Sequence, residues 1–164
     1  MTNEEFVRDV YETSYRRLVT QLVGTCGDVS TAEEVVQEAF VRAIAHGAAF
    51  SRTDNPEAWL RQVAVNLARS RWRRLKKYAG LMPRLAEPSA TPDLSPDHLI
   101  LMAALEQLPR VQREAIAMHH LADLPVNEIA AALGISSGTV KARLARGRAA
   151  LAQLLSEGSE VHHD

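Results

Sequence analysis

The segment from 123 to 148 constrains the fold of this chain more than any other stretch. Its first half has the apolar spacing of a short helix over 126–133, and Gly134 follows as a residue that readily takes the left-handed conformation of a tight turn. Ser136 is then placed to cap a second helix. The buried face of this second helix consists of Val140, Leu144 and Leu151. We therefore predict a helix-turn-helix, a motif that places its second helix in the major groove of DNA.

Any two short amphipathic helices with a glycine between them give this pattern, and the charges of the second helix decide between the interpretations. Four positive charges and no carboxylate suit phosphate neutralisation and guanine readout. They belong to Lys141, Arg143, Arg146 and Arg148. Ala130, beside Ile129 and Leu133 on the inner face of the first helix, is small enough to let the two helices approach closely.

The net charge of the 164-residue chain is −1, so the protein is not basic as a whole. Its basic residues are concentrated instead. Of 19 Lys and Arg, seven lie in 61–77 and four in 141–148, and neither segment contains Asp or Glu. Two separate basic segments predict two contacts with DNA, and the acidic remainder predicts a surface that faces a protein.

Composition also excludes several classes of protein. A single cysteine, Cys26, rules out a disulfide within the chain, and the acidic N-terminus and the lack of an 18-residue apolar run argue against a signal peptide and a membrane span. We expect a cytoplasmic protein. The pairs His119-His120 and His162-His163 have no cysteine or acid at ligand spacing, so no metal site is predicted. We also expect no cofactor, no catalytic residues and no small-molecule substrate.

Three helices are predicted in the N-terminal part: 5–23, 30–46 and 56–77. The second begins with a capping box from Ser30 to Glu33, and a polar loop follows it over 47–55. Its predicted buried stripe is Ala32, Val36, Ala39, Phe40, Ala43 and Ile44. The third helix starts after the N-cap Asn55 and presents a polar face that consists of Gln62, Asn66, Arg69, Ser70 and Arg73. Its positive charges would repel one another unless an anion such as DNA compensates them.

A Pro-rich segment over 79–97 predicts a flexible linker between two domains, 1–78 and 98–156, with a tail over 157–164. In the second domain we expect helices over 98–107 and 110–120 before the helix-turn-helix. The residues expected to pack onto the motif are Leu101, Leu105, Leu108, Ile116 and Leu121.

Four motifs in fixed order resemble those of the bacterial extracytoplasmic-function (ECF, group 4) RNA polymerase sigma factors. They are TAEEVVQEAFVRA at 31–43, PEAWLRQVAVNLA at 56–68, LEQLP at 105–109 and the helix-turn-helix. The resemblance covers nearly the whole chain. It implies an all-α fold of two small helical domains, sigma region 2 and sigma region 4, that brings core RNA polymerase to promoter DNA.

The resemblance also implies roles for single positions. The polymerase-binding positions are Glu34, Gln37 and Glu38, an acidic cluster for which we expect no basic partner in this chain. The positions for the minus-10 element are Asn66, Arg69, Ser70 and Arg73, with the loop over 50–55 capturing a flipped base. The positions for the minus-35 element are Thr139, Lys141, Ala142, Arg143 and Arg146.

Some residues depart from the pattern of the family. Ile44 replaces a frequent Trp, and Pro125 replaces the Ser that usually caps the first helix of the motif, which leaves that boundary open. Ser70 and Ala142 are small, so base preference does not transfer there. The chain ends at Asp164 without the extra domain of some relatives, and we expect any inhibitor to be a separate anti-sigma factor. The alternative, a stand-alone helix-turn-helix regulator, leaves the basic helix over 61–77 without a role.

Overall fold

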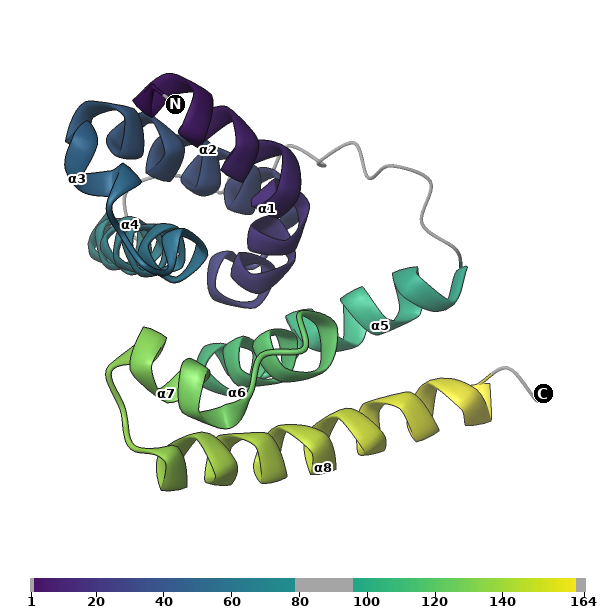
Figure 1. Ribbon diagram of the computed structural model, residues 1–164. Helices are drawn as coiled ribbons and strands as arrows, with labels where there is room; N and C mark the ends of the chain where they lie inside the picture. Colours follow the sequence, from purple (N-terminus) through teal and green to yellow (C-terminus); the bar gives the residue numbers. More distant parts are fainter. Residues whose placement is uncertain (1, 79–95, 162–164) are drawn as a thin grey trace. The chain divides into compact units, whose positions relative to one another are not determined.

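The computed structural model describes residues 2–78 and 96–161, in which every regular element is a helix (Figure 1). The chain divides into two compact units, Met1–Ser89 and Ala90–Asp164. The predicted all-α fold with two helical domains is confirmed. Most of the predicted linker, from 79 to 95, lies outside the described residues.

Over residues 2–78, the first unit contains three long helices and one short one. These are α1 (Asn3–Cys26), α2 (Val29–His46), α3 (Ala48–Ser51) and α4 (Pro56–Tyr78). The long helices α1, α2 and α4 contact one another pairwise. Their shared core is apolar and fully buried at Leu18, Leu22, Val36, Leu60 and Val65.

The caps in this unit differ in part from the predicted ones. A capping box between Thr2 and Glu5 starts α1, and Gly27 ends it with φ 92°. The N-cap of α2 is Asp28 rather than Ser30, because the Asp28 carboxylate accepts a hydrogen bond from the Thr31 amide at 2.7 Å. A carboxylate at a helix N-terminus also interacts favourably with the macrodipole. The predicted cap at Asn55 is confirmed, since its side chain accepts from the Ala58 amide at 3.1 Å.

The segment over 47–55 is only partly the loop that its polarity predicts. It contains the one-turn helix α3, and Phe50 at its centre is fully buried. The Phe50 ring lies 5.5 Å from that of Phe6 and 5.0 Å from that of Trp59. Phe50 therefore anchors the segment to the core, and Arg52, Asp54 and Asn55 are its exposed polar residues.

The described part of the second unit, 96–161, contains four α-helices and a π-helical turn. They are α5 (Pro96–Glu106), α6 (Arg110–Ile116), the π-helix η1 (Ala117–Leu121), α7 (Val126–Leu133) and α8 (Ser137–Val161). The predicted helix over 110–120 thus changes its hydrogen bonding midway. In addition, α8 continues five residues into the segment that was expected to be a tail. The helices α5, α6 and α7 all contact α8.

The helix-turn-helix has the boundaries that its sequence predicts. Gly134 takes the left-handed conformation, with φ 68° and ψ 36°, and the Ser136 hydroxyl accepts from the Thr139 amide at 3.1 Å. Pro125 is extended and precedes α7 without a side-chain cap. The inner face of α7 was predicted incorrectly at one position: Ala132 is buried, whereas Ala130 is half-buried.

A glycine sets the close approach of α6 and α8. Gly147 is buried, and a Cβ atom placed on it would lie 2.8 Å from Cγ1 of Ile116. That distance is too short for two carbon atoms, so any larger residue would push the helices apart. Gly147 thus fixes α8 against the rest of the unit.

Candidate nucleic-acid interface

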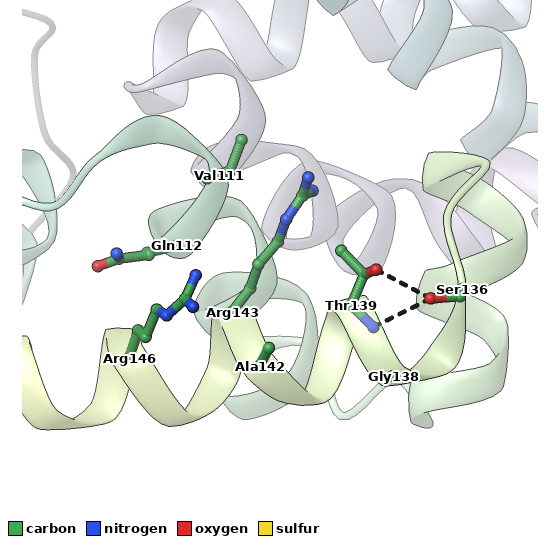
Figure 2. Close-up of a pocket in the computed structure, with 8 residues that line it drawn as sticks. All are labelled: Val111, Gln112, Ser136, Gly138, Thr139, Ala142, Arg143 and Arg146. Carbon is green, nitrogen blue, oxygen red and sulfur yellow. Dashed lines mark hydrogen bonds between the residues drawn. The ribbon is translucent and has the colours of Figure 1, made fainter.

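A groove runs along the N-terminal half of α8, where α6 faces it (Figure 2). Its volume is about 580 Å³. The lining residues are Val111, Gln112, Ser136, Gly138, Thr139, Ala142, Arg143 and Arg146. Four of the five positions predicted for the minus-35 element, Thr139, Ala142, Arg143 and Arg146, therefore share one surface.

The fifth predicted position, Lys141, is exposed but does not line this groove. Five residues of α-helix place it roughly 140° around the axis from Arg146. It lies instead on the flank of α8 that carries Arg148. Lys141 and Arg146 thus border the exposed face of the helix from opposite sides.

The two arginines of the groove keep their hydrogen-bonding capacity for a ligand. Neither Arg143 nor Arg146 has an ion-pair or hydrogen-bond partner among the described residues, whereas the Nε of Arg148 donates to Nε2 of His120 at 3.0 Å. Burial lowers the pKa of His120, and the nearby charges of Arg148 and His119 lower it further. A neutral imidazole is what accepts the Arg148 hydrogen bond. Within 2–78 and 96–161 no cluster of three or more metal-ligating residues occurs.

The second candidate surface is the outer face of α4. Asn66, Arg69, Ser70 and Arg73 follow one another at i, i+3, i+4 and i+7, so they share one side of the helix, opposite the buried Ala64. Asn66 and Arg73 are exposed, and Arg69 and Ser70 are half-buried. The Oδ1 of Asn66 accepts a hydrogen bond from the side-chain Nε2 of Gln62 at 3.1 Å. The structure thus brings the four predicted minus-10 positions together.

Arg61 does not belong to this basic surface. Its side chain is buried, its Nε donates to Oε1 of Gln21 at 2.8 Å, and its guanidinium lies 3.6 Å from the Glu57 carboxylate. The number of positive charges predicted to face DNA over 61–77 was therefore too high by at least one, that of Arg61. Arg61 ties α4 to α1 instead.

The acidic cluster on α2 does have partners within the chain, contrary to expectation. Glu34 forms an ion pair with Arg71 of α4 at 2.5 Å, and Glu38 lies 3.5 Å from Arg42. Gln37 donates to the hydroxyl of Tyr15 at 3.3 Å. All three predicted polymerase-binding side chains remain exposed, so these pairs leave them accessible.

Sequence reasoning missed two apolar residues on the same face of α2. Val41 is 56% exposed and Ile44 is 51% exposed, although Ile44 was predicted to be buried. Val35, which was not among the residues predicted to be buried, is buried. The signal was available in the spacing, since Val41 follows Gln37 by four residues and Ile44 follows Val41 by three. An exposed face that combines acids with aliphatic side chains is typical of a protein-binding surface.

The fold and these surfaces define a DNA-binding protein with two helical units, each with its own basic face. Known families match the same two units. The family described as Sigma-70 region 2 matches residues 10–78, and the family described as Sigma-70, region 4 matches residues 98–151.

Curated relatives match most of the chain. The RNA polymerase sigma-E factor of Streptomyces avermitilis is 35% identical over 161 residues, covering 94% of this chain and 83% of the relative. The ECF RNA polymerase sigma factor EcfG of Rhodopseudomonas palustris is 31% identical over 141 residues, covering 81% of this chain and 76% of the relative. The chain belongs to the ECF RNA polymerase sigma factors, and its function is promoter-directed initiation of transcription with RNA polymerase.

Solved structures share the fold. The sigma factor RpoE of Bartonella quintana, in complex with the anti-sigma factor NepR, has a TM-score of 0.70 and 26% identity and covers 93% of this chain and 98% of its own. CnrH, in complex with the cytosolic domain of CnrY, has a TM-score of 0.64 and 22% identity, covers 94% of this chain and 90% of its own, and shows the fold alone. Among the described helices, none combines the length and apolar character needed to cross a bilayer.

Proposed function

We propose that α8 reads the minus-35 element, that α4 engages the minus-10 element as its strands separate, and that the exposed face of α2 binds core RNA polymerase. The observation that carries this proposal is the groove of α8, where Arg143 and Arg146 stand without partners among the described residues. Unpaired guanidinium groups on a recognition helix suit bidentate bonds to guanine.

The two DNA contacts act as one when polymerase holds both units. Each contact alone is weak, and joining them makes the second binding event effectively intramolecular. Strand opening then comes from trapping unstacked bases at α4 and the exposed residues of the 51–55 segment, without ATP. In this role the chain itself catalyses no reaction.

We assign residues 1–78 to region 2 and 98–156 to region 4. We also propose that a separate anti-sigma factor inhibits this chain in the cytoplasm, where promoter DNA and polymerase are found. The similarity to RpoE, whose structure contains the anti-sigma factor NepR, supports a partner of this kind.

Reconstitution with core polymerase tests the assignment. Sequencing the transcripts that the holoenzyme initiates would define the promoter, and single-base changes in it would then be compared between variants. Asn66→Ala should leave closed-complex binding largely intact and reduce permanganate-detected melting, because a residue that holds an unstacked base acts only after opening begins. Unchanged melting on double-stranded promoters would remove α4 from this role. Gln153→Ala, on the exposed part of α8, serves as the matched control.

A further inference from the structure

The groove beside α8 contains a buried polar atom that the proposed DNA contacts leave unused. Gln112 of α6 lines the groove together with Arg143 and Arg146. Its Oε1 atom is buried and has no hydrogen-bond partner among the described residues. Buried acceptors are nearly always paired in folded proteins, so the Gln112 oxygen calls for a donor.

The backbone places Gln112 next to Arg146. Cβ of Gln112 lies 3.5 Å from the position that a Cβ atom on Gly147 would occupy. The glutamine side chain therefore starts beside the backbone of α8, one residue from Arg146. Figure 2 shows the Gln112 and Arg146 side chains at the same end of the groove, with Arg143 nearer to Thr139.

The chemistry of the two groups is complementary. A guanidinium has five N–H donors, and bidentate recognition of a guanine uses two of them. An acceptor that binds one of the others fixes the plane of the group and so its direction toward the base. A neutral amide oxygen does this without adding a negative charge beside the phosphates.

We propose that Gln112 is a positioning residue for Arg146: its Oε1 accepts a hydrogen bond from the Arg146 guanidinium when α8 lies in the major groove. This inference rests on the proposed function, because it requires Arg146 to read a base. Gln112 itself touches no base in this arrangement. It determines how strictly Arg146 discriminates between bases.

The test compares initiation by reconstituted holoenzyme on promoters that carry each of the four base pairs at every upstream position. Gln112→Met keeps the length of the side chain and removes the acceptor, whereas Gln112→Glu keeps an acceptor. Gln112→Met should lower discrimination about three- to tenfold at the single base pair that Arg146→Ala also affects, and Gln112→Glu should retain it. In the Gln112→Met/Arg146→Ala double variant the loss should equal that of Arg146→Ala alone. Gln153→Met is the matched control, and circular dichroism checks the fold of each variant.

The outcomes separate this inference from the proposed function. If Arg146→Ala is base-specific but Gln112→Met changes nothing, or lowers initiation equally on every sequence, the positioning role is wrong and the reading role of Arg146 stands. The positioning role is also wrong if Gln112→Met couples to Arg143→Ala instead. If Arg146→Ala itself acts equally on every upstream sequence, Arg146 is a phosphate contact, and both the assignment and the positioning role fail.

Discussion

Two glycines of α8 illustrate how a single residue type has opposite consequences at different positions. Gly147→Ala should lower the free energy of unfolding by about 1–3 kcal/mol, because the added Cβ would lie 2.8 Å from Cγ1 of Ile116 and 3.2 Å from its Cδ1. Gly158→Ala should raise it by about 0.5–1 kcal/mol, since nothing lies within 4 Å and alanine favours the helix. Urea unfolding followed by circular dichroism would compare the two, and a stabilised Gly147→Ala protein would contradict the tight contact.

His120 gives the protein a specific response to pH. Because burial and the neighbouring Arg148 and His119 lower its pKa below the ordinary 6.5, the folded protein binds its proton less readily than the unfolded chain. The contribution of neutral His120 to the free energy of unfolding is therefore fully present above about pH 6.5. It falls at lower pH as the unfolded chain becomes protonated, and it stops falling once His120 of the folded protein is also protonated.

We expect the midpoint of urea unfolding to fall less in the His120→Gln variant than in the parent protein as the pH drops below about 6.5. Above about pH 7.5, where His120 is neutral in both states, the curves of the two proteins should run parallel. Equal slopes for the variant and the parent between about pH 6.5 and 5 would show that another group carries the response.

Burial is the residue-scale property that the sequence conveyed least. Arg61 stands in a run of basic residues, and only the tertiary structure shows that its side chain is buried and that its Nε donates a hydrogen bond to Gln21 of α1. The pairing of Glu34 with Arg71 likewise joins residues 37 positions apart. Local periodicity cannot detect either contact, because it reports only the face of a helix on which a residue lies.

At the scale of elements, the ion pair between α2 and α4 allows the effect of a charge change on the fold to be distinguished from its effect on binding to polymerase. Glu34 and Arg71 are both substantially exposed, so their pair contributes at most about 1 kcal/mol to stability. Reversing Glu34 and Glu38 to Lys should abolish binding to core polymerase in a pull-down, with the circular dichroism spectrum unchanged. The reason is that the face of α2 proposed to bind polymerase would lose its negative charge.

The charge-swapped protein Glu34→Arg/Arg71→Glu is the decisive control. It restores an ion pair between the two helices but leaves a positive charge on the exposed face of α2. Core binding should remain lost in this protein. Recovered binding would mean that Glu34 matters only for holding α2 against α4.

Element boundaries followed from the sequence where the local chemistry was unambiguous. Gly134 and Ser136 define the turn of the helix-turn-helix by their own conformational and capping preferences, and Asn55 with Pro56 defines the start of α4. The one-turn helix α3 could not be predicted in this way. Its four residues are held by burial of Phe50 against distant rings rather than by helix propensity.

At the scale of the whole molecule, each unit has its own buried core, which includes Leu22 and Leu60 in the first and Ile129 and Leu144 in the second. We therefore expect segments 1–78 and 96–164 to fold when expressed separately, each with a cooperative thermal transition. The sum of their far-ultraviolet spectra should reproduce that of the full chain. A segment that melts without cooperativity would show that its core is incomplete alone.

The π-helix η1 has a consequence for how chain length can vary. Its wide turn, in which the Ala122 amide donates to the Ala117 carbonyl at 3.0 Å, holds one residue more than an α-helical turn of the same span. Removing one residue between 117 and 121 would convert the segment to ordinary α-helix while leaving α7 and α8 in register. The second unit therefore carries, immediately before its helix-turn-helix, a place where the deletion of one residue is absorbed locally.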